Sequence, residues 1–307
     1  MSLLVIGSVA FDALETPFGK TDKIIGGSAT YITLSASYFT KKVNLVAVVG
    51  DDFLKSDIDM LQKHGINTQG LQIKEGEKSF FWSGRYHNDM NTRDTLATEL
   101  NVLADFDPII PEAYQDCEFL MLGNATPSVQ RTVIERLRNR PKLIVLDTMN
   151  LWMSIALDDL KQTLKLVDVL TINDEEARQL SNEYSLVKAA KKILQMGPKV
   201  LIIKKGEHGA LLFNKDQIFF APALPLEEVF DPTGAGDTFA GGFIGYLAST
   251  NDISFENMKR ALIYGSAMAS FCVEKFGTER IVNLAPDELE NRVQEFIDLI
   301  QFEITVS

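Results

Sequence analysis

The feature that most constrains the fold of this chain is the regular alternation of short apolar runs with helical patterns. Runs rich in Val, Ile and Leu predict strands at residues 3–9, 43–49, 119–122, 143–147, 169–172 and 200–204. Helical patterns fall at residues 28–39, 53–64, 128–139, 151–166, 174–180, 186–196, 236–248, 255–271 and 286–300. Strands that are apolar on both faces and alternate with helices are typical of a mainly parallel sheet. The sequence therefore predicts a three-layer α/β/α fold.

Two stretches, residues 13–25 and 70–102, interrupt this alternation. The second contains two runs of alternating pattern, Leu71 to Ile73 and Phe80 to Tyr86, without a helix between them. We expect both stretches to form a small β-sheet lid inserted into the α/β domain. That domain would comprise residues 1–12, 26–69 and 103–307.

A small exposed sheet has edges with unpaired backbone groups that need covering, so we expect a homodimer through the lid.

Size and charge narrow the class of protein. The 307 residues, 46% of them hydrophobic, are enough for one large domain with an appended lobe. A net charge of −12 repels polyanions, so nucleic acid is not expected as a partner. No apolar run approaches the roughly 18 residues of a membrane span, and no basic segment precedes the first apolar run. We expect a protein of the cytoplasm without a membrane partner.

The cysteines and histidines do not suggest a metal site. Cys117 and Cys272 stand in no CxxC pattern, and His64, His87 and His208 are scattered along the chain. We expect two buried, reduced thiols.

The strongest chemical signal is the segment from Asp231 to Asp237, which reads DPTGAGD and leads into a helical pattern. Small residues at Gly234, Ala235 and Gly236 let backbone N–H groups converge, and the start of a helix adds its positive end. Such a turn predicts a phosphate site. Asp237 in the first turn is placed to take a proton from a hydroxyl that attacks a phosphoryl group. The alternative is a glycine-rich turn in which Asp237 only favours the helix start.

Two other phosphate motifs do not qualify. Phe18 to Thr21 resembles the end of a P-loop, but its first glycine should fall at Leu14 and no helical pattern follows. The first strand is followed by Gly7 alone and not by GxGxxG, so the dinucleotide-binding fingerprint is missing.

Six motifs in order resemble those of the ribokinase-like (PfkB) carbohydrate kinase family, over the whole chain. The two signatures are DxTGAGD and the run Gly26-Gly27-Ser28-Ala29 at an early helix. The others are the runs GSVAFD at 7–12, VGDD at 49–52, NDEE at 173–176 and GEHG at 206–209. The resemblance implies an enzyme that uses ATP and Mg²⁺ to phosphorylate an alcohol group of a small sugar-like substrate.

The resemblance also implies roles for individual residues. Asp237 would be the general base, and the backbone of residues 234–236 would stabilise charge on the transferred phosphoryl group. A carboxylate that only accepts hydrogen bonds, next to exposed backbone, suits a polyol. The expected substrate-binding residues are Asp12, Gly26, Gly27, Tyr31, Arg93 and Asp237. Arg93 is alternatively a surface residue of the lid.

The resemblance to the family also implies which residues bind the nucleotide. The expected nucleotide-binding residues are Asn173, Lys204, Gly206, Gly209, Gly234, Gly236 and Gly277. Asn173 and Glu176 resemble the motif that positions Mg²⁺ through water; their alternative is an N-cap and a first-turn acid. Lys204 stands where the family often has Thr or Ser, and either meets a phosphate or is a solvated strand-end charge. Asp231 and the loop at Gly277 are where K⁺ would bind.

Departures from the family pattern leave the substrate open. Members that act on ribose carry a lysine and an asparagine where this chain has Ser28 and Tyr31, so ribose itself is not expected. The lid run from Phe80 to Tyr86 is rich in aromatic residues, which stack on nucleobases and on sugars or pack the lid itself. A nucleoside kinase on the same fold is therefore an alternative to a sugar kinase, and a non-catalytic sugar- or nucleotide-binding regulator is another.

Overall fold

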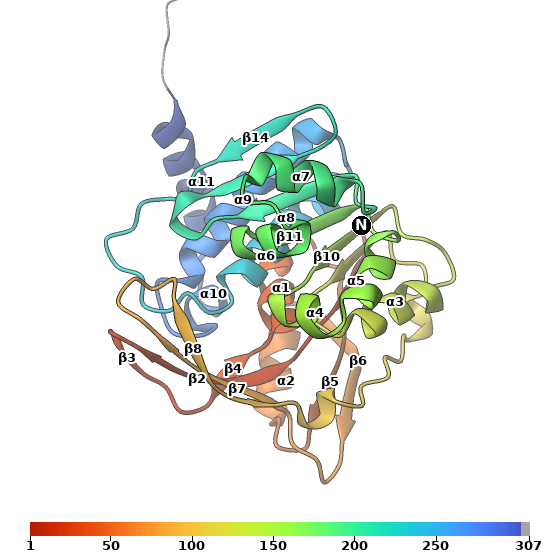
Figure 1. Cartoon of the computed structure of the whole chain (residues 1–307). Coiled ribbons are helices and arrows are strands. Elements are labelled where there is room, and N and C mark those ends of the chain that lie inside the picture. Colours follow the sequence, from red (N-terminus) through yellow and green to blue (C-terminus); the bar gives the residue numbers. More distant parts are fainter. Residues whose placement is uncertain (302–307) are drawn as a thin grey trace, which may run out of the picture.

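A nine-stranded sheet forms the centre of the molecule (Figure 1). In the computed structural model, which describes residues 1–301, its strands are β1 (Leu3–Ile6), β5 (Val43–Gly50), β6 (Ile66–Lys74), β9 (Phe119–Leu122), β10 (Leu143–Asp147), β11 (Val169–Asn173), β12 (Val200–Lys204), β13 (Ala210–Phe213) and β14 (Ile218–Ala221). They lie in the order β14-β13-β12-β11-β10-β9-β1-β5-β6. The pairs from β6 to β12 are parallel, and β13 and β14 continue the sheet antiparallel. The predicted mainly parallel sheet is confirmed.

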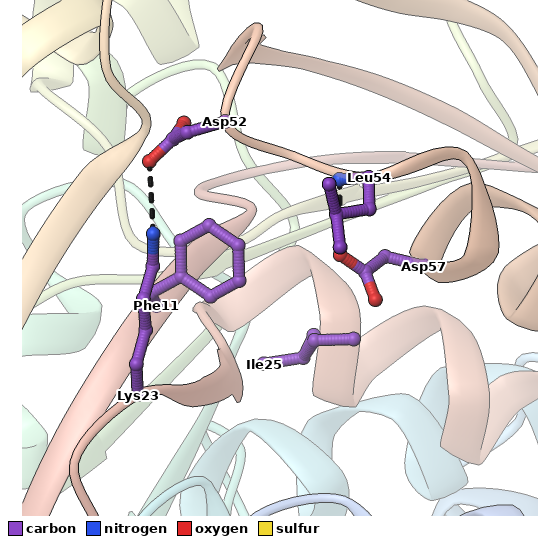
Figure 2. A pocket seen from close by; sticks show the side chains of 6 residues that line it. All are labelled: Phe11, Lys23, Ile25, Asp52, Leu54 and Asp57. Carbon is purple, nitrogen blue, oxygen red and sulfur yellow. Dashed lines mark hydrogen bonds and ion pairs between the residues drawn. The ribbon is translucent and has the colours of Figure 1, made fainter.

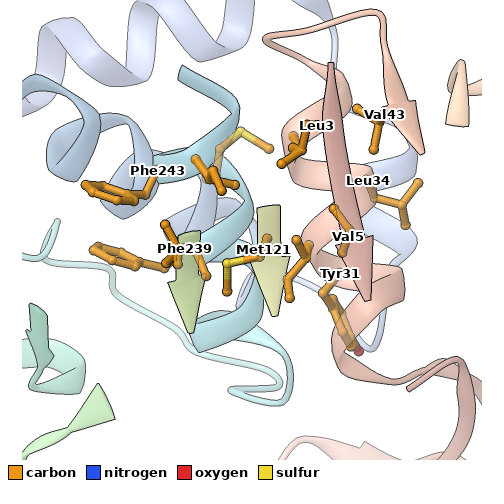
Figure 3. Close-up of a cluster of buried hydrophobic side chains, with 14 of the residues drawn as sticks. Leu3, Val5, Tyr31, Leu34, Val43, Met121, Phe239 and Phe243 are labelled. Carbon is orange, nitrogen blue, oxygen red and sulfur yellow. The ribbon is translucent and has the colours of Figure 1, made fainter. Parts of the chain in front are cut away.

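Helices cover both faces of this sheet because successive residues of a buried strand point to opposite faces. Leu3 and Val5 of β1 belong to one hydrophobic cluster (Figure 3), and Leu4 and Ile6 belong to a second one. The helices over the first cluster are α1 (Ser28–Ser37), α2 (Lys55–Lys63), α8 (Ala235–Thr250), α9 (Phe255–Cys272), α10 (Glu279–Val282) and α11 (Pro286–Ile300). Those over the second are α3 (Pro127–Arg136), α4 (Asn150–Ile155), α5 (Leu157–Leu164), α6 (Asp174–Ser181) and α7 (Leu186–Leu194). The predicted three layers are therefore present.

Helix α8 packs unusually close to its neighbours because glycines line two of its sides. A Cβ on Gly241 would lie 2.4 Å from the carbonyl oxygen of Ile32 in α1. A Cβ on Gly242 would lie 3.0 Å from the Cα of Gly265 in α9. Each glycine costs roughly 1 kcal/mol of helix propensity relative to alanine, which the tight packing offsets. The position of the helix start, where DPTGAGD lies, is thus set by two packed neighbours.

A second, five-stranded sheet lies against the carboxyl edge of the large one (Figure 1). Its strands are β2 (Ala10–Thr16), β3 (Gly19–Lys20), β4 (Ile24–Gly26), β7 (Phe80–Tyr86) and β8 (Arg93–Glu99). The order is β3-β2-β7-β8, with β4 also paired to β2. This small separate sheet was expected from the interrupted alternation.

The assignment of residues to the two sheets differs from the prediction at two places. The predicted strand 3–9 ends at Ile6, and β2 of the small sheet already starts at Ala10, so Asp12 lies in the small sheet. The run Leu71 to Ile73 belongs to β6, which pairs with β5 in the large sheet. An edge strand of either sheet is buried on one face, so its alternating pattern does not tell the two sheets apart.

The predicted helix 151–166 is also wrong as a single element. It is divided into α4 and α5 at Ala156, whose backbone angles (φ −141°, ψ 34°) are not helical. The indole N–H of Trp152 in α4 donates to the side chain of Asn124, at 2.8 Å. Neither glycine nor proline marks the break, so local sequence carried no signal for it.

Two further expectations concern the cysteines and membrane-spanning helices. Cys117 and Cys272 are both buried and unpaired, as expected. Within residues 1–301, no helix combines the length and the apolar character that crossing a membrane requires.

Candidate active site

The predicted site residues gather where parallel strands end. Asp147, Asn173 and Lys204 are the last residues of the adjacent strands β10, β11 and β12. The carboxyl ends of parallel strands meet at one edge of a sheet, which is where ligands bind in open α/β folds. Helix α8 starts with Ala235 at this edge, and the small sheet faces it.

The turn before α8 has the geometry that its sequence predicts. Gly234 is the N-cap and has a left-handed backbone (φ 76°), which favours glycine. A Cβ there would also lie 2.4 Å from the ring of Tyr31. The amide of Thr238 donates to the carbonyl of Gly234 at 2.8 Å and so starts the helical ladder. The amide of Ala235 donates to the carbonyl of Pro232 at 3.2 Å, whereas among residues 1–301 the amides of Gly236 and Asp237 have no carbonyl in a preceding turn. These free N–H groups make the turn a candidate anion-binding helix start.

Asp237 lies in that first turn with a strongly perturbed acidity. Burial of its carboxyl, together with the negative charge of Asp147, raises its pKa to about 7. The positive charges of Lys204 and Arg93 act in the opposite direction. A carboxyl with a pKa near neutrality is well matched to proton transfer at physiological pH. The arrangement can therefore accept a proton beside an anion-binding turn.

Lys204 reaches into the site instead of into solvent. Its Nζ lies 2.7 Å from Oδ2 of Asp147, and the two side chains are 17% and 7% exposed. Burial disfavours the charge of Lys204, but Asp147 and Glu176 raise its pKa above the usual value. The interpretation as a solvated strand-end charge is therefore wrong.

Asn173 and Glu176 form a reciprocal capping box at the start of α6. The amide of Glu176 donates to Oδ1 of Asn173, and the amide of Asn173 donates to Oε2 of Glu176, both at 2.8 Å. This is the structural alternative considered for the pair. Glu176 is nevertheless buried within the site, where burial and the charge of Asp147 raise its pKa to about 7.

Asp12 faces the same site from β2 of the small sheet. Burial, followed by the charges of Asp231 and Asp237, raises its pKa to about 7. A Cβ on Gly26 would lie only 1.9 Å from its carboxylate, and Gly27 has a left-handed backbone with φ 91°. Gly26 is thus required by the close approach of Asp12, and Gly27 by its own backbone conformation and by the carbonyl oxygen of Ser8, 2.5 Å from the position of a Cβ.

The ring of Tyr31 lies against Gly234, and Tyr31 belongs to the hydrophobic cluster drawn in Figure 3. It is almost fully buried, and its hydroxyl has no hydrogen-bond partner among residues 1–301. Burial raises the pKa of this phenol well above its usual value, and the charges of Asp12 and Asp231 add to the effect. The structure therefore brings Tyr31 together with the acidic groups of the site.

Besides Asp12, two hydrogen bonds join the small sheet and its β7–β8 loop to the loops of the site. The hydroxyl of Thr233 donates to the hydroxyl of Tyr86 at 3.1 Å, which joins β7 to the anion-binding turn. The side chain of Asn91 donates to Glu207 at 3.4 Å, next to the turn formed by Gly206 and Gly209. The small sheet therefore covers the site in this structure.

Asp231 and Gly277 connect two loops of the site. The fully buried carboxylate of Asp231 accepts bonds from the amides of Thr233 and Gly277, both at 2.8 Å. Gly277 has a left-handed backbone (φ 57°), so glycine is favoured there. Burial raises the pKa of Asp231, and the two amides oppose that shift.

The arrangement of donors does not form a closed metal site. Within the part of the chain that the structure describes, no three side chains of His, Cys, Asp or Glu are grouped to hold a metal ion. Mg²⁺ typically binds through one or two carboxylates, water and substrate phosphates. The buried carboxylate of Glu176, one of several in the site, fits that mode.

A separate hollow of about 280 Å³ lies between β2, β4 and the start of α2 (Figure 2). Lys23 spans it, with Nζ 4.0 Å from the ring centre of Phe11 and 3.1 Å from Asp52. Because neighbouring side chains of a strand alternate, Phe11 points away from the face that carries Asp12. The hollow is therefore not part of the candidate site.

Sequence reasoning missed two residues of the site. Asp147 was not among the predicted site residues, although a carboxylate at a buried strand end is itself a signal. Tyr86 was considered only as one of several lid aromatics. Their contacts join residues 57 and 147 positions apart, which no local pattern predicts.

Comparison with known proteins shows which proteins this chain is similar to. Residues 2–283 match the pfkB family of carbohydrate kinases. A cytidine kinase of Thermococcus kodakarensis is 32% identical over 250 residues, which are 80% of this chain and 87% of the relative. A nucleoside kinase of Methanothermobacter thermautotrophicus is 26% identical over 307 residues, covering 90% and 91% of the two chains.

A solved structure shows the same fold. It is a provisionally named ribokinase II from E. coli in complex with ATP and Mg²⁺, with a TM-score of 0.78 and 19% identity. The likeness covers 95% of this chain and 99% of that one. The ribokinase-like fold that the six motifs predicted is therefore confirmed. Because the family match extends over nearly the whole chain, this protein belongs to the pfkB family of carbohydrate kinases.

Proposed function

We propose that this protein transfers the γ-phosphoryl group of ATP to a sugar hydroxyl of a nucleoside, with Asp237 as general base. Enzymes of its family are phosphotransferases with an alcohol group as acceptor. A nucleoside is favoured over a free sugar by the 32% identity to a cytidine kinase. Transfer to a free pentose or hexose is the second candidate. Ribokinase relatives support it less, because they match either at lower identity, 24% over 312 residues for that of Haemophilus influenzae, or over a shorter stretch, 31% over 128 residues for that of Staphylococcus aureus.

One observation carries the proposal: a carboxyl with a pKa of about 7 lies in the first turn of a helix that begins with a glycine-rich anion turn. Asp237 takes the proton of the substrate hydroxyl as its oxygen bonds to the γ-phosphorus. The bond from that phosphorus to the bridging oxygen breaks, and ADP leaves. The backbone of Gly234, Ala235 and Gly236 stabilises the charge on the equatorial oxygens.

On the substrate side, Asp12, Gly26 and Gly27 are proposed to bind sugar hydroxyls. A buried carboxylate next to exposed backbone supports this role, since it offers acceptors and donors to a polyol. Tyr31, with its unpartnered hydroxyl, and Arg93, whose charge influences Asp237, are the further candidates.

On the nucleotide side, the proposed contacts lie in the loops that follow β11 and β12 and in the turn before α10. They are Asn173, Lys204, Gly206, Gly209 and Gly277, with Gly234 and Gly236 at the phosphates. Mg²⁺ bound near Glu176 and Asn173 would neutralise phosphate charge. The E. coli neighbour, solved in complex with ATP and Mg²⁺, supports ATP and Mg²⁺ as the ligands.

We further propose that K⁺ binds beside Asp231. A carboxylate has about four lone-pair sites, and the amides of Thr233 and Gly277 occupy two of them. Replacement of KCl by NaCl should then lower turnover, and Asp231→Asn should remove the difference. Equal rates in both salts would contradict the proposal.

A homodimer in the cytoplasm, formed through the small sheet of the lid, is also proposed. β8 is an edge strand of the small sheet, and its Leu96 is 50% exposed. Light scattering of the purified protein at micromolar concentration should give twice the mass of 34.2 kDa. A monomer would contradict the dimer.

The central experiment measures ADP release with Mg-ATP and K⁺ against nucleosides, pentoses, hexoses, hexose phosphates and inositols. Asp237→Asn should reduce turnover by about 10² or more without loss of folding. Asp287→Asn is the matched control, since Asp287 is also a first-turn acid, in α11. Turnover of a sugar alone would shift the assignment to the second candidate. Silence across the panel, or full activity of Asp237→Asn, would contradict the proposed function.

A further inference from the structure

Lys204 and Asp147 form the most deeply placed ion pair of the site. Their atoms Nζ and Oδ2 lie 2.7 Å apart, and both side chains are mostly buried. The pair crosses β11, because Lys204 ends β12 beside Asn173, and Asp147 ends β10 beside Thr171. A lysine at a strand end has four methylene groups with which to reach water, and here it turns inward over the sheet edge instead.

The opposite end of the same strand offers a direct comparison. Lys199, just before β12, is paired with Asp168 at 3.2 Å, but its side chain is 80% exposed. Asp168 is itself buried, but water surrounds Lys199 and screens its charge, so this lysine contributes little. Lys204 differs in burial and in what lies beside it.

The ammonium of Lys204 borders the anion-binding turn. A Cβ on Gly236 would lie 3.0 Å from Nζ, so glycine at this position leaves room for the lysine beside the first turn of α8. An ammonium has three donors, and Asp147 is the one hydrogen-bond partner of Nζ among residues 1–301. Two donors therefore remain for a ligand at the turn.

The surroundings of Nζ explain why Asp147 is needed. Asp147 from β10, Glu176 from α6 and Asp237 from α8 face it with negative charge, and Arg93 from β8 is the second cation of this group. Without Asp147, the lysine would be free to pair with Asp237 and to block its role as base. The bond to Asp147 keeps Lys204 beside the turn and apart from that carboxylate.

We infer that Lys204 donates to the γ-phosphoryl group during transfer, and that Asp147 is the residue that positions it. This inference rests on the proposed function. The new bond joins the acceptor oxygen to the γ-phosphorus, the bond to the bridging oxygen breaks, and the proton passes to Asp237. Lys204 stays charged throughout and stabilises the oxygens of the phosphoryl group. It thereby distinguishes ATP from ADP, which lacks that group.

The test compares the affinities of the full chain for AMP-PNP, a non-hydrolysable ATP analogue, and for ADP, by calorimetry with Mg²⁺. Lys204→Met should weaken AMP-PNP binding about 10- to 100-fold, the scale of a lost charged hydrogen bond, and ADP binding less than threefold. Lys199→Met should change neither. Equal weakening for both nucleotides, or no weakening, would overturn the inference.

Lys204→Met leaves the buried carboxylate of Asp147 without a partner and is itself at risk of unfolding. The double variant Lys204→Met/Asp147→Asn removes both charges and should show the same selective loss of AMP-PNP affinity. Asp147→Asn alone should lower kcat at least tenfold with ADP affinity unchanged, a split that a purely structural role would not produce. An unchanged kcat in Asp147→Asn would remove the positioning role.

The same measurements separate this inference from the function on which it rests. A wild-type chain that binds no nucleotide and phosphorylates nothing contradicts both. A wild-type chain that is active, with Lys204→Met equally active and equally tight for AMP-PNP, contradicts the lysine role alone.

Discussion

The hydroxyl of Thr233, in the anion-binding turn, donates to the hydroxyl of Tyr86, in the small sheet, at 3.1 Å. Tyr86 is 6% exposed, so this bond is shielded from water. It joins the sheet that covers the site to the turn that is proposed to stabilise the phosphoryl group. Closure of the cover and ordering of the turn are therefore coupled through one pair of hydroxyls.

Tyr86→Phe removes this bond and keeps the ring. Such a bond is worth roughly 0.5–1.5 kcal/mol net, so we expect kcat/KM to fall about 2- to 10-fold while the fold stays intact. Thr233→Val removes the same bond from the other side. Steady-state kinetics of both variants and of the double variant test the coupling, because the two effects should not add. Fully additive losses would mean that the hydroxyls act separately.

The pH dependence of turnover follows from Asp237. Its pKa of about 7 means that the carboxylate needed as a base is lost as the pH falls through about 7. We expect kcat/KM to rise from pH 5.5 and to level off above pH 8. Asp12 has a similar pKa, so Asp12→Asn is the control: the acidic limb should remain in this variant, at lower overall activity. A pH-independent rate between 5.5 and 8 would contradict the assignment of Asp237.

Stability should change with pH in the opposite direction. The pKa values of Asp12 and Asp237 are raised from 3.8 to about 7, and that of Glu176 from 4.5 to about 7. Between about pH 4 and 7 the folded state therefore binds more protons than the unfolded state, so the free energy of unfolding falls as the pH rises. Thermal unfolding of the ligand-free protein should give a higher Tm at pH 6 than at pH 8. Asp12→Asn should reduce that difference, whereas a Tm that rises over this range would refute the burial argument.

Gly65 and Gly234 have nearly equal φ angles. Their alanine variants therefore separate the cost of a left-handed backbone from the cost of a steric collision of the new Cβ. Gly65 (φ 75°) has no heavy atom within 4 Å of the position of a Cβ, and Gly65→Ala should cost about 1–2 kcal/mol of unfolding free energy for its backbone alone. Gly234 (φ 76°) has the Tyr31 ring 2.4 Å from that position. Gly234→Ala should therefore cost more stability than Gly65→Ala and should also lower kcat at least tenfold. Denaturant unfolding and steady-state kinetics measure both, and equal stability losses would contradict the predicted collision.

Much of the fold was predictable because its signals are local. The apolar runs that predicted β5, β9, β10, β11 and β12 reappear in the structure within one residue at each end. A buried parallel strand needs apolar side chains on both faces, so its composition alone identifies it. The start of α8 was predicted for a similar reason. Backbone N–H groups at a helix start are accessible to a ligand only where the residues there are small.

The predictions were wrong or left open where contacts between distant segments of the chain determine the structure. Leu71 to Ile73 has the alternation of a half-buried strand, but its choice of sheet depends on β5, which precedes it. Asn173 and Glu176 have the spacing both of a capping box and of a Mg²⁺ motif, and the structure contains the capping box. A spacing of three residues on a helix serves both purposes, so the sequence alone left the choice open.

The order of motifs, the three layers and the nature of the anion turn were therefore already contained in the sequence, because each depends on neighbours a few positions apart. The direction of Lys204, the collision that requires Gly26 beside Asp12 and the closure of Tyr86 onto Thr233 were decided by the tertiary structure. Burial and charge–charge distances set the acidity of the site, and these quantities exist only once strands 50 or more residues apart have met at one edge of a sheet.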